Sequence, residues 1–156
     1  MEQLFQYNWE VRDEWFEICS ELPHDELVQE RVGGVGSILK TLFHIIDVEY
    51  SWIKAIQNET ITDPDYSDYL SLELVRALSV QYQKEIIEFI RQWSSEDDEK
   101  EVSTSWDHEL YTGGEILRHV LVHEIHHIGQ LSVWSRALGV KPASANFINR
   151  NIRKTE

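Results

Sequence analysis

Proline and glycine divide this sequence into four long segments, and that spacing constrains the fold more than any other feature. All the prolines fall between segments with a regular apolar pattern: Pro23, Pro64 and Pro142. Six of the seven glycines lie between these segments or at their ends: Gly33, Gly34, Gly36, Gly113, Gly114 and Gly139. Because these residues interrupt helices and favour turns, the four segments between them are free to form long helices.

Each of these segments carries apolar residues at intervals of three and four, the period of an amphipathic helix. The segments cover about residues 2–21, 37–58, 71–93 and 113–138. Ser37 can cap the second helix, and Thr112 precedes Glu115 by three residues, which is the spacing of a capping box. Four long helices joined by loops predict an all-α fold, namely a four-helix bundle.

The remaining sequence predicts little regular structure. The charged stretch SSEDDEKE is typical of a solvated linker, and strand-like alternation is confined to about residues 102–106. We expect one short additional helix in the tail, over residues 144–153. A length of 156 residues suits one hydrophobic core, so we expect a single domain over residues 1–156.

Charge and cysteine content exclude several classes of protein. The chain has 28 acidic and 14 basic residues, and its net charge of −14 repels phosphate backbones and anionic membranes. No run of about 18 apolar residues is present, so we expect no membrane span. Cys19 is the only cysteine, which excludes an internal disulfide. We therefore expect a cytoplasmic protein that binds neither nucleic acid nor membrane.

Four of the seven histidines lie within the stretch RHVLVHEIHHIGQ of the fourth segment. A single helical histidine is more often a packing residue than a ligand. His123 and His127, however, are four residues apart, so in a helix both lie on one face, with Cβ atoms about 5–6 Å apart. Two imidazoles so placed can bind one ion. His119 and His123 have the same spacing, so spacing alone leaves two candidate pairs.

A third ligand has to come from another helix. His44 lies near the middle of the second segment, in TLFHIIDVEYSW, and the middles of two packed helices face each other in a bundle. Three neutral imidazoles leave one position of a tetrahedral ion open, as in catalytic sites. His24 and His108 fall in expected loops, and we interpret them as surface residues.

The stretches GSILKTLFHIIDVEYSW and YTGGEILRHVLVHEIHHIGQLS closely resemble the two signature stretches of the DinB/YfiT-like superfamily, which is unrelated to the DNA polymerase of similar name. The resemblance implies a bundle with up-down-down-up connectivity, homodimerisation, and one divalent metal ion, zinc or nickel. It also implies one ligand on the second helix, matching His44, and an HxxxH pair before a Gly-Gln step, matching His123 and His127. His119 and His126 then become neighbours of the site.

Some members of this superfamily look like thiol-dependent transferases that use bacillithiol, mycothiol or glutathione, and many members have no assigned reaction. The resemblance therefore implies a metal-dependent transferase or hydrolase that acts on a small electrophile. Its partners would be a low-molecular-weight thiol and a small-molecule substrate.

Other polar and aromatic residues lie close to these histidines in the sequence. A metal-bound imidazole usually donates its second N–H to an oxygen, and the nearby candidates are Asp47, Glu49, Glu124 and Gln130. Asp47, three residues after His44, is our first choice as an orienting or acid–base catalytic group. Aromatic residues could line a pocket above the metal, although such residues more often belong to the core: Tyr50, Trp52, Trp106, Tyr111 and Trp134.

Two other functions compete with this hypothesis. The stretch HEIHH matches the HExxH motif of zinc metalloproteases, but the extended motif needs glycine and histidine where this chain has Gln130 and Val133. A non-enzymatic metal-binding or stress-related bundle is the second alternative. An enzyme predicts a site open to water above the histidines, whereas a structural site predicts a fourth protein ligand or a sealed core.

Overall fold

The computed structural model describes residues 1–60, 63–106 and 109–152. Its described residues form five α-helices: α1 (Glu2–Ser20), α2 (His24–Val28), α3 (Ile38–Ile56), α4 (Leu72–Gln92) and α5 (Gly113–Ala137). They also form one 3-10 turn and a small antiparallel sheet: Tyr66–Asp68, β1 (Glu101–Ser103) and β2 (Leu110–Thr112). The four long helices begin and end within two residues of the predicted segments, so the predicted all-α bundle is confirmed.

Capping side chains fix the starts of the two helices that carry the candidate metal ligands. The Ser37 hydroxyl accepts a hydrogen bond from the Lys40 backbone N–H at 3.2 Å and begins α3. At α5, the Thr112 hydroxyl accepts from the Glu115 backbone N–H, and the Glu115 carboxylate accepts from the Thr112 backbone N–H. This reciprocal pair is the predicted capping box.

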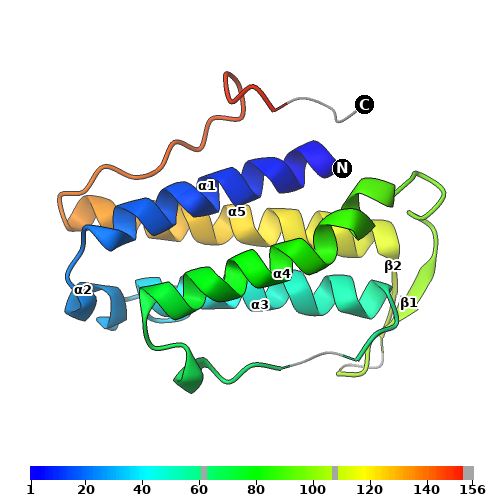
Figure 1. Ribbon diagram of the computed structural model, residues 1–156, viewed down its shortest axis with the longest axis horizontal. Coiled ribbons are helices and arrows are strands. Elements are labelled where there is room, and N and C mark those ends of the chain that lie inside the picture. Colours follow the sequence, from blue (N-terminus) through cyan, green and yellow to red (C-terminus); the bar gives the residue numbers. More distant parts are fainter. Residues whose placement is uncertain (61–62, 107–108, 153–156) are drawn as a thin grey trace.

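The helices are connected up-down-down-up, as the resemblance implied. In Figure 1, α1 and α5 run in one direction along the bundle, and α3 and α4 run in the other. α3 packs against both α4 and α5, and α1 packs against the same two helices from the opposite side. Because α3 and α4 are parallel, the chain between them has to return along the length of the bundle.

A single apolar core fills the space between the four long helices. Its largest fully buried side chains include Phe5, Trp15, Phe16, Leu39, Leu42, Ile45, Ile46, Ile53, Ile86 and Ile90. α3 supplies many of these side chains. Because they occupy the core side of α3, His44 lies at the edge of the core, beside α5. Within the described part of the chain, no helix combines the length and the apolar character needed to cross a membrane.

The predicted helix in the tail is wrong for the described residues 144–152. This segment runs back beside α1 in an irregular conformation (Figure 1). Bonds to other parts of the molecule replace a helical ladder: the Tyr7 hydroxyl donates to the Ala145 carbonyl at 2.7 Å, and Arg150 donates to Glu14 at 2.7 Å. The tail is therefore held by α1 rather than by its own backbone.

Two smaller predictions need adjustment. Strand structure near residues 102–106 is present, but it is the three-residue β1, which pairs with β2 just before α5. His24 is exposed, as expected, but it begins the short helix α2 instead of lying in a loop. His108 lies outside the described residues.

Candidate metal centre

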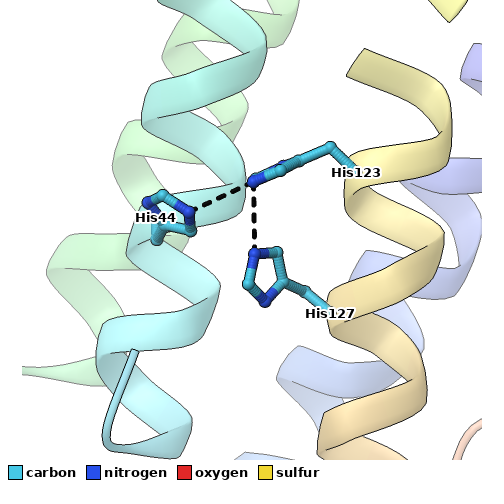
Figure 2. A group of neighbouring side chains, drawn as sticks. All are labelled: His44, His123 and His127. Carbon is cyan, nitrogen blue, oxygen red and sulfur yellow. Dashed lines mark hydrogen bonds between the residues drawn. The ribbon is translucent and has the colours of Figure 1, made fainter. Parts of the chain in front are cut away.

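Three histidine side chains from two helices meet at one point between α3 and α5. Figure 2 shows His44 reaching from α3 toward His123 and His127 on α5. The Nε2 atom of His123 lies 3.1 Å from Nε2 of His44 and 3.2 Å from Nε2 of His127. The structure thus brings together the three residues that the sequence singled out as candidate ligands.

The local sequence explains this convergence. His123 and His127 are separated by one helical turn, so α5 presents both on the same side. On α3, Leu42, Ile45 and Ile46 are buried in the core and fix the rotation of the helix about its axis. That rotation turns His44 toward α5, the helix with which α3 has its most extensive contact. The site is therefore a consequence of how two amphipathic helices pack.

The geometry of the three nitrogen atoms fits a divalent metal ion. Ligand nitrogens at 2.0–2.1 Å from a tetrahedral ion lie about 3.3 Å from one another, close to the observed 3.1 and 3.2 Å. Among the described residues, the cluster of possible metal ligands consists of these three histidines and no cysteine or carboxylate. His127 is 6 % exposed, whereas His44 and His123 are partly open to solvent.

The electrostatic environment keeps these imidazoles neutral. Burial, reinforced by His127 and Lys40, lowers the pKa of His44 to about 4. Burial and the neighbouring histidines lower the pKa of His123 to about 3, and burial lowers the pKa of His127 as well. A metal ion binds the neutral form of imidazole, so near pH 7 the site needs no deprotonation before binding.

Gln130 orients one of the three rings. The Nδ1 atom of His127 lies 2.8 Å from Oε1 of Gln130, and this geometry places the ring N–H at Nδ1 and the lone pair at Nε2. The amide nitrogen of Gln130 lies 3.0 Å from Nε2 of His126. Gln130 was one of four candidate orienting residues, and it is the one bonded to the triad. His126 lies behind it and outside the triad.

Asp47, three residues after His44 on α3, does not bond to the triad. Its carboxylate accepts a hydrogen bond from the Ser51 hydroxyl at 3.4 Å and faces a cavity of about 400 Å³ that Trp52, Asp63 and Trp106 also line. Burial, reinforced by the negative charge of Asp63, raises the pKa of Asp47 to about 6. A carboxyl group with this pKa can gain or lose a proton near neutral pH.

Aromatic side chains connect this cavity to the triad. The Trp52 ring meets Trp106 edge to face at a centroid distance of 4.8 Å and lies 5.5 Å from the His119 ring. His119 in turn lies 5.8 Å from His123. Tyr111 also contacts Trp52, so three of the five aromatic candidates gather here.

The other two aromatic candidates lie elsewhere. Tyr50 stacks on Tyr82 with ring centroids 3.6 Å apart, and its hydroxyl bonds to Glu85. Trp134 packs beneath the loop before α3 and donates its indole N–H to the Val32 carbonyl at 3.2 Å.

Glu49 and Glu124, the remaining orienting candidates, turn away from the triad toward Arg12. The fully buried Arg12 donates to Glu124 at 2.8 and 2.7 Å and to Glu49 at 3.1 and 2.9 Å. Burial by itself lowers the pKa of Arg12, but the two carboxylates outweigh it and raise that pKa. This network joins α1, α3 and α5 inside the core. Arg12 was missed because its sequence neighbours give no sign of a buried partner.

The same network removes the basis for the metalloprotease hypothesis. In the HExxH motif the glutamate acts as general base beside the metal. Here that residue is Glu124, which is 1 % exposed and held by Arg12 on the core side of α5. The histidines of the motif are in place, but its base is engaged elsewhere.

The fold and the site together define a helical bundle with a histidine cluster between two of its helices. The sequence profile of the DinB family matches residues 1–154, and the chain belongs to that family. It is 49 % identical over 154 residues to the uncharacterised protein YizA of Bacillus subtilis strain 168, covering 98 % of this chain and 97 % of YizA.

Solved structures show the same fold at low sequence identity. A DinB-like protein of Bacillus cereus ATCC 10987 superposes with a TM-score of 0.71 at 16 % identity, covering 91 % of this chain and 93 % of that one. The DinB-like protein YjoA of Bacillus subtilis superposes with a TM-score of 0.62 at 19 % identity, covering 91 % and 96 %. These similarities establish the architecture and leave the chemistry to be argued from the site.

Proposed function

We propose that this protein binds one divalent metal ion, zinc or nickel, through His44, His123 and His127. The observation that carries this proposal is the convergence of three histidines: Nε2 of His123 lies 3.1 and 3.2 Å from Nε2 of His44 and His127, and one ligand atom of each residue lies within 4.8 Å of the other two. Two further features support it: the lowered pKa values keep the rings neutral, and Gln130 directs the lone pair of His127 toward the other two.

We further propose that this protein is a metal-dependent enzyme. It would transfer a low-molecular-weight thiol to a small electrophile, or hydrolyse such a compound. A divalent ion at the triad supplies Lewis acidity and favours the deprotonated form of a thiol or water. Asp47 accepts the proton at a carboxylate oxygen, since a pKa of about 6 leaves it ionised at pH 7. The cavity of about 400 Å³ that Asp47 lines has the volume of a small-molecule site, and Trp52 and Trp106 give it an aromatic wall.

This proposal is preferred to a purely structural metal site because of the ligand count. Structural zinc sites have four protein ligands, and the described residues supply three. The partial exposure of His44 and His123 is also what access by a substrate requires. A non-enzymatic metal-binding bundle is the alternative that an activity assay has to exclude.

Metal analysis of the purified, tag-free protein tests the first proposal. We expect close to one equivalent of zinc or nickel in the wild type and a loss of metal in His44→Ala, His123→Ala and His127→Ala. The matched controls are His119→Ala and His126→Ala, which remove neighbouring imidazoles and should keep the metal. Absence of metal from the wild type after reconstitution would contradict the proposal.

Assays of the metal-loaded protein test the second proposal. Conjugation of bacillithiol or glutathione to an aryl chloride, and hydrolysis of an activated ester, should proceed with the wild type and stop in His44→Ala. A protein that holds a full equivalent of metal but accelerates neither reaction would support the non-enzymatic alternative.

We also propose that the protein forms a homodimer in the cytoplasm. The outer face of α5 exposes three apolar side chains along one stripe: Val122, Ile125 and Val133 are 60 %, 48 % and 65 % exposed. Exposed apolar stripes of this kind are typical of protein interfaces. Light scattering should give twice the mass of 18.4 kDa for the wild type and the monomer mass for Ile125→Asp. A monomeric wild type would contradict this proposal.

A further inference from the structure

We infer that Gly34 is a positioning residue of the metal centre: the side chain it lacks leaves the space in which Gln130 holds the His127 ring. The inference rests on the proposed metal site and adds a residue from outside the two ligand-bearing helices. It also gives a role to the glycine-rich stretch RVGGVGS, which connects α2 to α3.

A hydrogen bond connects this glycine-rich stretch to the second half of α5. Gly33, Gly34 and Gly36 all have positive φ angles, of 89°, 57° and 110°, which glycine adopts without steric cost. The resulting turn places the Val32 carbonyl 3.2 Å from the indole nitrogen of Trp134, which donates to it. In Figure 1 the segment between α2 and α3 lies at the same end of the bundle as the last turns of α5.

At Gly34 the backbone approaches Gln130 so closely that any side chain there would require Gln130 to move. A Cβ atom there would lie 2.6 Å from Oε1 of Gln130 and 3.1 Å from the Trp134 ring. Trp134 is buried and its indole N–H bonds to the Val32 carbonyl, whereas the Gln130 carboxamide is the far end of a partly exposed, flexible side chain. A methyl group at position 34 would therefore be accommodated by rotation of Gln130.

That rotation would remove the acceptor of His127. The atom displaced is Oε1, the same oxygen that lies 2.8 Å from Nδ1 of His127. Without this bond, nothing selects the tautomer that carries its lone pair on Nε2, and the ring loses its orientation toward His123. Loss of an orienting partner of a metal-bound histidine typically lowers metal affinity about 10–100-fold.

The neighbouring glycine provides a matched control. Gly33 also has a positive φ angle, so alanine is strained at both positions. A Cβ on Gly33, however, meets no atom within 4 Å. Gly33→Ala therefore introduces the backbone strain without the contact to Gln130, and any difference between the two variants reports on that contact.

The experiment measures zinc affinity by chelator competition for the wild type, Gly34→Ala, Gly33→Ala, Gln130→Ala and the Gly34→Ala/Gln130→Ala double variant. We expect Gly34→Ala and Gln130→Ala each to bind zinc about 10–100-fold more weakly, and Gly33→Ala to bind like the wild type. In the double variant Gly34→Ala should add nothing, because the group it displaces is already gone.

A second readout needs no metal. In the metal-free protein at neutral pH, nitrogen-15 NMR should find the single N–H of the His127 ring on Nδ1 in the wild type and Gly33→Ala, and a mixture of the Nδ1–H and Nε2–H tautomers in Gly34→Ala. The inference is overturned if Gly34→Ala matches Gly33→Ala in both measurements, or if its effect persists undiminished in the Gln130→Ala background. A wild type that binds no zinc overturns the metal proposal instead, and the NMR comparison then decides whether Gly34 positions His127.

Discussion

Replacing Arg12 by methionine should destabilise the protein more than any comparable surface change. The guanidinium is 1 % exposed and donates four hydrogen bonds to Glu49 and Glu124 at distances of 2.7 to 3.1 Å. Methionine fills much of the same volume but offers no donor. Two carboxylates would then remain in the core without a counter-charge, so Arg12→Met tests whether this network is essential.

The size of the effect follows from the burial of the orphaned carboxylates. Removing one partner of a buried ion pair typically costs about 3–5 kcal/mol. Protonation limits the loss for each group: a glutamate titrates near pH 4.3 when exposed, so keeping it protonated at pH 7 costs about 3.7 kcal/mol. Against a total stability of about 5–15 kcal/mol, a loss in this range is large and lowers Tm by about 6–20 °C.

The loss should also depend on pH. Burial already raises the pKa of Glu124, and without Arg12 that pKa rises further above its unfolded value. The folded variant then holds a proton that the unfolded chain releases, so its stability falls as pH rises, by about 1.4 kcal/mol per pH unit for one proton. The deficit relative to the wild type should therefore be about 2–3 kcal/mol smaller at pH 5 than at pH 7.

Urea unfolding of the metal-free protein, followed by far-UV circular dichroism at pH 5, 6 and 7, measures these deficits. Arg76→Met is the matched control, because Arg76 forms an ion pair with Glu17 at the surface, where the two side chains are 43 % and 65 % exposed. Such a pair contributes about 0–1 kcal/mol. A deficit for Arg12→Met that is as small as that of the control, or equal at all three pH values, would refute this reasoning.

Three further predictions concern the site and its supporting helix. Asp47→Asn should keep the metal but lower the turnover number by about 100-fold or more. In a pH–rate profile we expect the activity of the wild type to rise with pH near 6, as Asp47 loses its proton, and that of Asp47→Asn to lack this rise. In urea titrations the metal-free protein should lose stability as pH falls below about 6.5. In the unfolded chain His44 and His123 bind protons near pH 6.5, whereas in the folded protein their pKa values are lowered to about 4 and 3. The stability of a His44→Gln/His123→Gln variant should therefore depend less on pH. Thr112→Ala should cost about 1 kcal/mol in urea unfolding by removing the cap of α5, with the metal content unchanged.

Helix positions could be predicted from the sequence because their ends are encoded locally. Ser37 and Thr112 cap α3 and α5 as their sequence context indicated, and the glycine and proline clusters mark the connections. These signals depend on residues three or four positions apart, which a single sequence displays directly. The order and direction of the helices in the bundle came from the family resemblance.

The surroundings of the triad were harder to predict, because they depend on contacts between distant parts of the chain. Arg12 finds its partners 37 and 112 residues away, and the helical pattern of α1 does not distinguish it from a solvated arginine. Asp47 was favoured over Gln130 as the partner of a ligand because it is a carboxylate near His44. In the structure Asp47 accepts a hydrogen bond from Ser51, one turn further along α3, and lines the cavity of about 400 Å³ instead of bonding to the triad.

In the tail, by contrast, the local sequence predicted a helix that the described residues do not form. The sequence predicts a helix over residues 144–153, but contacts with α1 hold the described residues 144–152 in an irregular conformation. Tertiary contacts of this kind override weak local propensity, because a short helix gains little from its own hydrogen bonds.

The most direct test of the account is X-ray absorption at the metal edge of the zinc-loaded protein, recorded for the wild type and His44→Ala. We expect three imidazole nitrogens at about 2.0–2.1 Å in the wild type and fewer in the variant. A coordination shell without histidine, or one that is identical in the two proteins, would contradict the assignment of the metal to His44, His123 and His127.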